Sequence, residues 1–205
     1  MAQLTFYTNP MSRGQIARWM LEEVGEPYEQ VLLDYGTTMK APEYLAINPM
    51  GKVPAIKHGD IVVTEAAAIC AYLADAFPAA GLAPEASARG DYYRWMFFAA
   101  GPIETAVTAR SLGLEAPADK AMMAGYGSYD AAMDALERAV AGRKFIAGDR
   151  FSAADVYVGS QIDWGLLFKS MPDRQAFHDY VGPLRERAGY RSAKETDRAL
   201  MPKQP

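Results

Sequence analysis

Short runs of hydrophobic and polar residues fill the first 78 positions, and they predict a small sheet with helices. The run Leu4-Thr5-Phe6-Tyr7 is rich in strand formers and is broken at Asn9-Pro10. A stretch follows whose apolar side chains recur at the three- and four-residue spacing of a helix, namely Ile16, Trp19, Met20 and Val24. Gly25 is placed to end this helix, and residues 28–33 are a second strand candidate. We therefore expect the chain to open with a β-α-β unit.

A hairpin and a helix are expected to complete this first domain. Two apolar runs, 53–57 and 61–63, are joined by His58-Gly59-Asp60, in which Gly-Asp supplies the turn. The apolar stretch from Glu65 to about Phe77 then predicts a helix, which Thr64 is expected to cap. The predicted order is βαβ followed by ββα.

Capping motifs mark two helix starts, one at the helix that contains Ile16 and one in the second half of the chain. Ser12-Arg13-Gly14-Gln15 has the Ser-x-x-Gln form of a capping box, so Ser12 is expected to be an N-cap paired with Gln15. Ser152 and Asp155 form a second such box, flanked by Phe151 and Val156 as a hydrophobic staple. The second box predicts the start of a buried helix.

A proline- and alanine-rich stretch, 78–84, separates the first domain from a helical remainder. We expect a first domain at 1–78, a linker at 79–87 and a helical domain at 88–205. Within that last domain, glycine and proline breaks divide the helical signal into segments near 88–112, 117–141, 153–169 and 173–187. The expected fold class is α/β plus all-α.

Composition favours a soluble protein. Of 205 residues, 50% are hydrophobic and 22% are charged, and the net charge is −4. No apolar run approaches the roughly 18 residues that cross a bilayer, and the opening MAQLTFYTNP lacks the basic and apolar regions of a signal peptide. We therefore expect a cytoplasmic location and no membrane partner, and the mild acidity disfavours nucleic acid as a partner.

Metal and disulfide chemistry are not expected. Cys70 is the single cysteine and lies in the apolar run AAAICAYLA, where it is expected to be a core residue. His58 and His178 are far apart, and neither lies in a recognisable ligand spacing. No metal site is predicted.

The order of elements, with a hairpin beginning Val-Pro and a helix beginning Thr-Glu-Ala, resembles the soluble, cytosolic-type glutathione S-transferases of bacteria. The resemblance covers nearly the whole chain, and its most specific pieces are residues 48–56 (NPMGKVPAI) and 65–73 (EAAAICAYL). It implies a thioredoxin-like βαβ-ββα domain that binds glutathione, followed by an all-helical domain that lines the pocket for an electrophile.

Residues matching the glutathione site stand at several positions. In the family, the dipeptide matching Val53-Pro54 is cis and presents its backbone to the cysteinyl part of glutathione, and the acid matching Glu65 binds the γ-glutamyl amino group. The next position usually carries a hydroxyl that holds the γ-glutamyl carboxylate, whereas this chain has Ala66. Since a hydrogen bond to a charged group contributes roughly 1.5–3 kcal/mol, its loss is expected to weaken binding on the order of tenfold or more.

Lys40 and Lys52 match positions where related enzymes place basic side chains near the glycine carboxylate of glutathione. The alternative for each is an ordinary solvated surface lysine. The stretch from Lys40 to Pro42 leads directly into Asn48-Pro49, so Lys40 is the stronger candidate.

The residue that activates the thiol has two candidates under the resemblance. Some classes use a tyrosine at the end of the first strand, where Tyr7 stands, and others use a serine at the start of the first helix, where Ser12 stands. No cysteine lies nearby, which disfavours the cysteine class. Ser12 is favoured because its hydroxyl would add a donor to the free N–H groups of a helix start.

The electrophile pocket is expected to involve Met11, Phe97, Glu104 and Trp164. Phe97 and Glu104 share a helix face, and Trp164 resembles a pocket residue, although the aromatic residues could equally belong to the core. A carboxylate at Glu104 is unusual there, and it could act on a substrate proton.

The leading interpretation is a homodimeric, cytoplasmic detoxification enzyme that conjugates glutathione, used as a co-substrate, to a small apolar electrophile without a metal. Two alternatives stay open. One is an enzyme that keeps glutathione but reduces peroxides, cleaves ethers, removes halogens or isomerises its substrate. The other is a non-catalytic binding or regulatory protein on the same fold. Ala66 is the feature that most favours the second alternative.

Overall fold

The computed structural model describes residues 3–201, and residue contacts divide the chain into two compact units. The first comprises the chain up to Leu82 together with the segment from Arg187 onward, and the second is Ala83–Glu186. This division differs from the one expected from sequence, which assigned residues 88–205 to a single helical domain. The difference lies in the last helix, which packs on the first unit.

A four-stranded sheet forms the centre of the first unit. Its order is β2-β1-β3-β4, with β1 and β2 parallel and the other pairs antiparallel. The strands are β1 (Leu4–Thr8), β2 (Glu29–Leu32), β3 (Ala55–His58) and β4 (Ile61–Thr64). The predicted β-α-β unit and hairpin are therefore confirmed.

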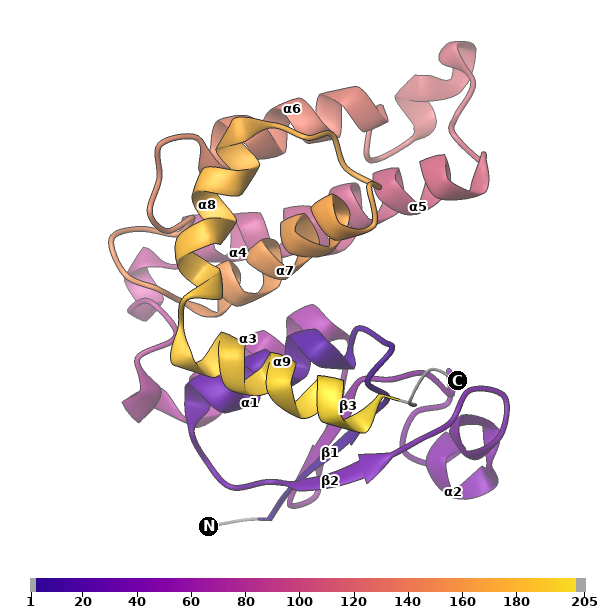
Figure 1. Cartoon of the computed structure of the whole chain (residues 1–205). Helices are drawn as coiled ribbons and strands as arrows, with labels where there is room; N and C mark the ends of the chain where they lie inside the picture. Colours follow the sequence, from indigo (N-terminus) through magenta and orange to yellow (C-terminus); the bar gives the residue numbers. More distant parts are fainter. Residues whose placement is uncertain (1–2, 202–205) are drawn as a thin grey trace. The chain divides into compact units, whose positions relative to one another are not determined.

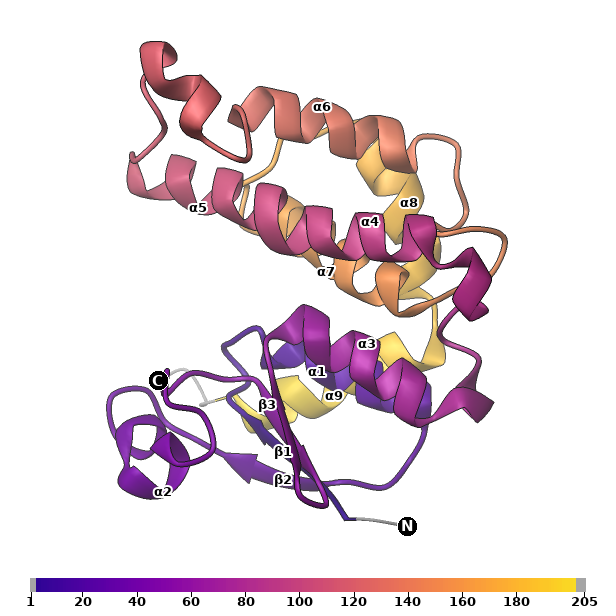
Figure 2. The same ribbon diagram turned by 180° about the vertical axis from the view of Figure 1, so that it is seen from behind.

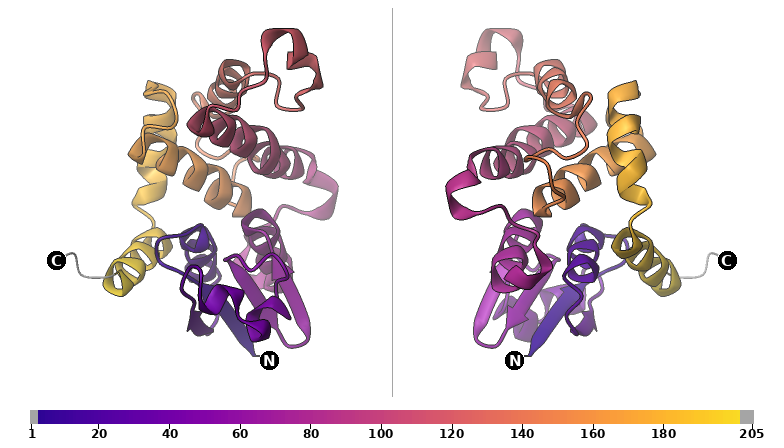
Figure 3. Two further views of the ribbon diagram at one scale, coloured as in Figure 1. Left: turned by 90° about the vertical axis from the view of Figure 1, so that its right-hand side faces the viewer. Right: turned by 90° about the vertical axis from the view of Figure 1, so that its left-hand side faces the viewer.

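Three helices stand side by side against one face of this sheet, in the order α9 (Ala188–Leu200), α1 (Gly14–Val24), α3 (Ala66–Ala76) (Figures 1 and 3). Phe6 of β1 points toward this layer, since the Arg18 guanidinium of α1 lies 5.2 Å from its ring centre. Successive strand residues face opposite sides. Accordingly Tyr7 packs on the other face, beside Tyr44 of the short helix α2 (Pro42–Leu45).

Two predicted helix caps are wrong. α1 begins at Gly14 with Arg13 at its N-cap, and the Gln15 side chain donates to the Pro10 carbonyl instead of to Ser12. Thr64 remains in β4, and Glu65 is the N-cap of α3 without a side-chain capping bond. The prediction for the other end of α1 is confirmed, because Gly25 ends it with φ 76°, a left-handed conformation that suits glycine.

The second unit is all-helical. α4 and α5 continue one another through a π-helical turn that contains Pro102 (Figure 2). α7 packs against α4 and α8, and α6 packs against α5 and α8. The helices are α4 (Gly90–Phe98), η4 (Ala99–Ile103), α5 (Glu104–Leu112), α6 (Tyr129–Val140), α7 (Ala153–Leu167) and α8 (Gln175–Arg185).

Shorter helical turns account for the rest. They are η1 (Thr38–Lys40), η2 (Pro78–Ala80), η3 (Ala86–Ala88) and η5 (Ala118–Met123). The helix expected over 117–141 is thus realised only as η5 and, after a break, α6. Together with the sheet of the first unit, the helical second unit confirms the expected fold class.

The capping box of α7 is confirmed, and it lies deep in the second unit. The Ser152 N–H donates to Asp155 Oδ2 at 2.9 Å, and Asp155 Oδ1 accepts from the Ile146 N–H and the Tyr180 hydroxyl, both at 2.8 Å. Burial raises the pKa of Asp155 despite these donors. The carboxylate joins the start of α7 to the preceding loop and to α8.

Burial tests the sequence expectation for the single cysteine. Cys70 is fully buried in α3, where burial raises the pKa of its thiol, so it is a core residue as predicted. Among the described residues, no helix is both long enough and apolar enough to span a bilayer.

Candidate functional site

Strand register brings the ends of three strands to one edge of the sheet. Tyr7 of β1 pairs with Ala55 of β3, and Ala55 pairs in turn with Thr64 of β4. Since β3 is antiparallel to both neighbours, the segment after β1, the segment before β3 and the segment after β4 meet there. These segments carry Ser12, Val53-Pro54 and Glu65, which are far apart in the sequence.

The turn after β1 is held by the side chain of Asn9. Its Nδ2 donates to the carbonyl of Leu33 at 2.8 Å, and its Oδ1 accepts from the Met11 N–H at 2.9 Å. The Met11 side chain is 59% exposed. Asn9 therefore joins the turn to the end of β2, a role that the sequence indicated only as a strand break.

Ser12 closes this turn and is 7% exposed. Its Oγ donates to the Asn9 carbonyl at 2.6 Å and accepts from the Gly14 N–H at 2.9 Å. A Cβ at position 14 would lie 2.0 Å from Thr8 Oγ1, so only glycine lets α1 begin this close to β1. The Ser12 hydroxyl thus stands at the N-terminus of α1, where free N–H groups favour negative charge.

Tyr7, the second candidate for thiol activation, has a different environment. Its ring is 5.5 Å from that of Tyr44, and it packs against a buried cluster. The members of this cluster are Leu33, Met39, Tyr44 and Ala55. Because Tyr44 is buried among these apolar side chains, its pKa is raised to about 12. Tyr7 is therefore held as a packing aromatic residue.

The segment before β3 contains a cis peptide bond between Val53 and Pro54, as expected. The carbonyl of Lys52 accepts from the Tyr44 hydroxyl at 2.5 Å and from Asn48 Nδ2 at 2.8 Å. These two side chains fix the loop immediately before Val53.

The two candidate lysines lie on the surface of the same loop region. Lys40 Nζ donates to the carbonyl of Met50 at 3.0 Å, and the Lys52 side chain is exposed. Lys40 is thereby directed toward the Met50-Gly51 turn that leads into Val53.

Glu65 has an unusual backbone conformation at the start of α3. Its φ is 65° and its ψ is 119°, one of two non-glycine residues with positive φ in the described part of the chain. The side chain is exposed, and Ala66 behind it is the buried first residue of α3. Residues strained in this way concentrate at binding sites, so the outlier marks Glu65 as a candidate ligand-binding residue.

The second unit holds the other candidates. Phe97 is 72% exposed on α4, whereas its neighbours Trp95 and Met96 belong to the core. Trp164 of α7 is partly buried, with its ring 6.0 Å from that of Phe168.

Glu104 is oriented by a residue that sequence reasoning missed. Gln161 Nε2 donates to Glu104 Oε2 at 3.0 Å and lies 3.2 Å from the Tyr157 hydroxyl. Glu104 is the first residue of α5, directly after the π-helical turn, a feature that is frequent at functional sites. Gln161 lies three residues before Trp164 on α7 and so on the same helix face. This spacing was the signal from which sequence reasoning could have found Gln161.

Family models match most of both units. The model of the glutathione S-transferase N-terminal domain matches residues 2–75, and that of the glutathione S-transferase C-terminal domain matches residues 105–164.

Individual relatives agree with the family models. Glutathione S-transferase 3 of Zea mays is 32% identical over 167 residues, which cover 76% of this chain and 75% of that protein. Among solved structures, a glutathione S-transferase of Xylella fastidiosa has a TM-score of 0.77 at 25% identity and covers 97% of this chain and all of its own. A sphingomonad glutathione S-transferase complexed with glutathione has a TM-score of 0.75 at 27% identity, covering 94% of this chain and 98% of its own.

Proposed function

Since the chain belongs to the glutathione S-transferase family, we propose that it binds glutathione at the sheet edge and activates its thiol for attack on a small apolar electrophile. The observation that carries the proposal is the gathering of Ser12, Val53-Pro54 and Glu65 at this edge. Each of these segments carries a group that can bind a different part of the tripeptide.

In this proposal the γ-glutamyl end of glutathione binds at the start of α3. The exposed Glu65 carboxylate pairs with the α-amino group, and the free N–H groups of the first turn of α3 hold the α-carboxylate. Ala66 contributes no hydroxyl. Binding at this end therefore depends on the backbone and on Glu65.

The rest of the tripeptide extends along the loop before β3. The Val53 backbone pairs with the cysteinyl residue in the manner of an added strand. Lys40 and Lys52 supply positive charge for the glycine carboxylate, with Lys40 placed by its bond to Met50. A homodimer and a cytoplasmic location complete the proposal.

Ser12 is the proposed thiol activator. Its hydroxyl proton turns from the Asn9 carbonyl toward the sulfur, while the Gly14 N–H continues to donate to Oγ and strengthens it as a donor. An ordinary thiol has a pKa near 8.5, and a shift of roughly two units would leave most of it ionised at pH 7.

The reaction balances without a metal or redox partner. The thiol proton passes to solvent, the sulfur lone pair forms a bond to the electrophilic carbon, and either a leaving group departs with its electron pair or the carbon skeleton takes up a proton. Three apolar side chains are proposed to bind the electrophile: the exposed Met11 in the first unit, and the exposed Phe97 and the partly buried Trp164 in the second. Glu104, held by Gln161, would act on a substrate proton.

The test is an activity assay of the full chain with glutathione and an activated aryl halide. Saturable conjugation that falls in Ser12→Ala but persists in Tyr7→Phe supports the proposal. Thiolate absorbance without conjugation, followed by turnover of peroxides or aryl ethers, would move the function to the other glutathione-dependent reactions. Absence of glutathione binding would leave a binding or regulatory protein.

A further inference from the structure

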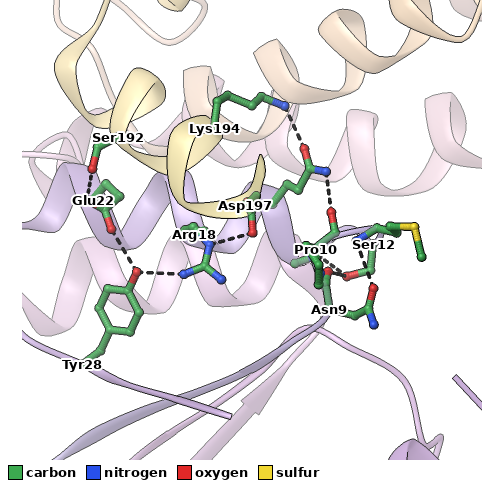
Figure 4. A network of polar contacts seen from close by, with 12 residues as sticks. Asn9, Pro10, Ser12, Arg18, Glu22, Tyr28, Ser192, Lys194 and Asp197 are labelled. Atoms are coloured by element: carbon green, nitrogen blue, oxygen red, sulfur yellow. Dashed lines mark hydrogen bonds and ion pairs between the residues drawn. The ribbon is translucent and has the colours of Figure 1, made fainter. Parts of the chain in front are cut away.

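The side chain of Gln15 connects the last helix to the turn that carries Ser12. Figure 4 labels the residues at the two ends of this connection, Lys194 and Pro10, together with Ser12. Lys194 Nζ, on α9, donates to Gln15 Oε1 at 2.9 Å. Gln15 Nε2 donates in turn to the Pro10 carbonyl at 2.6 Å. A cation on α9 is thus connected to the backbone two residues before Ser12 by two consecutive hydrogen bonds.

α9 is a firm support for this connection because ion pairs hold it on α1 at both ends. Near its start, the Arg187 guanidinium binds both carboxylate oxygens of Glu23, at 2.8 and 2.7 Å. Near its end, Asp197 accepts from the Nε of buried Arg18 at 2.8 Å. Lys194 lies between these two anchors and one turn before Asp197.

The peptide unit between Pro10 and Met11 is held at both of its polar atoms. Gln15 binds its carbonyl oxygen, and Asn9 Oδ1 binds its N–H at 2.9 Å. The next peptide unit sets the Ser12 N–H, which donates to the Asn9 carbonyl at 3.1 Å. Rotation of the Pro10-Met11 unit would therefore move Ser12, and Gln15 opposes this rotation from the side of α1.

Lys194 determines how the Gln15 amide is oriented. An ammonium group only donates and a carbonyl only accepts, so the amide must direct its oxygen to Lys194 and its NH₂ to Pro10. The positive charge on the oxygen also polarises the amide, which strengthens the bond from Nε2 to Pro10. Removal of the lysine loses both effects while the surrounding helix stays in place.

We propose that Lys194 and Gln15 are positioning residues for the thiol-activating hydroxyl: α9 sets the Pro10-Met11 peptide, and with it Ser12, through the Gln15 amide. This inference rests on the proposed function, since it gives Ser12 the role of donor to the glutathione sulfur. Neither residue touches glutathione in this scheme. Their loss affects thiol ionisation and turnover more than affinity.

The test compares the full-length protein with Lys194→Met, Gln15→Leu and the double variant. Lys194 is partly exposed, so its replacement leaves the fold intact. Lys57→Met, which removes an exposed lysine from β3, is the matched control, and Lys194→Arg restores a donor. The readouts are kcat and KM for conjugation, and the pKa of bound glutathione from its thiolate absorbance.

Lys194→Met is expected to raise the bound thiol pKa by about half to one unit and so to lower kcat about 2- to 6-fold at pH 6.5, with the glutathione Kd within about twofold. The double variant should equal Gln15→Leu alone, because the lysine acts through that amide. Effects that multiply in the double variant, or a bound thiol pKa equal to that of wild type, would overturn the inference while leaving the proposed function intact. A wild-type protein that forms no thiolate would overturn both.

Discussion

Arg18 Nε donates to Asp197 Oδ1 at 2.8 Å and so joins the first helix of the chain to the last across 179 positions. Both side chains are almost completely buried. Arg18 also donates to the Tyr28 hydroxyl at 3.1 Å, which donates to Glu22 at 2.9 Å. The pair therefore lies at the centre of a polar network that joins α1, α9 and Tyr28, the residue directly before β2 (Figure 4).

Asp197→Leu is expected to lower the free energy of unfolding by about 3–5 kcal/mol, because it leaves the Arg18 guanidinium buried without its carboxylate. Replacing both partners with leucine should recover part of this loss, since no uncompensated charge remains. Urea denaturation measures both. Loss of the exposed Arg94–Asp91 pair, 3.8 Å apart, is the control and should cost less than about 1 kcal/mol. A double variant as unstable as Asp197→Leu would contradict this account of the pair.

Backbone strain at Glu65 predicts an ordering of stabilities. At φ 65° a Cβ is unfavourable, so Glu65→Gly should be more stable than Glu65→Ala by about 1 kcal/mol, even though glycine gains entropy on unfolding. Both variants lose the carboxylate proposed to bind the amino group. Thermal or urea unfolding decides the order, and an alanine variant at least as stable as the glycine variant would show that the conformation carries no strain.

Ala66→Ser is expected to tighten glutathione binding about tenfold, because a serine hydroxyl at this position would donate to the γ-glutamyl carboxylate. Isothermal titration calorimetry gives the Kd. Ala67→Ser, one residue later in the same helix, is the control and should leave the Kd unchanged. An unchanged or weaker Kd for Ala66→Ser would place the γ-glutamyl group elsewhere.

Burial and the neighbouring Glu22 raise the pKa of Tyr28 to about 12, while Arg18 opposes the shift. A folded-state pKa above the unfolded value near 10 means that the stabilisation is complete below pH 10 and is lost as the pH rises through 12. Between these values the unfolding free energy of wild type should fall more steeply than that of Tyr28→Phe, by up to about 1.4 kcal/mol per pH unit. Urea unfolding at several alkaline pH values tests this, and parallel profiles would contradict it.

Much of the fold could be predicted because its signals are local. Strand formers at Leu4-Tyr7, the turn at Gly59-Asp60 and the box at Ser152-Asp155 act within a few residues. The box at Ser12 failed because the Gln15 side chain is taken by Pro10 and by Lys194, which lies 179 residues away. No sequence pattern near Ser12 predicts that Lys194 binds Gln15.

The last helix was missed for a related reason. α9 buries only Ala193 and Asp197, so its packing face lacks the apolar periodicity that predicts a buried helix. From sequence alone, Asp197 is expected to be exposed to solvent, because its buried partner Arg18 is distant in the sequence. For the candidate site, resemblance supplied Ser12, Val53-Pro54 and Glu65, whereas Asn9 and Gln161 became visible only through their hydrogen bonds.

The central claim is that this chain ionises the glutathione thiol with the hydroxyl of Ser12. The most direct test titrates the full protein with glutathione by calorimetry at pH 7 in two buffers of different ionisation enthalpy, which reports affinity and the protons released. We predict saturable binding with release of roughly 0.7 proton per site for wild type and Tyr7→Phe, and release near zero for Ser12→Ala. Binding without proton release in wild type, or release that survives in Ser12→Ala and disappears in Tyr7→Phe, would contradict the claim.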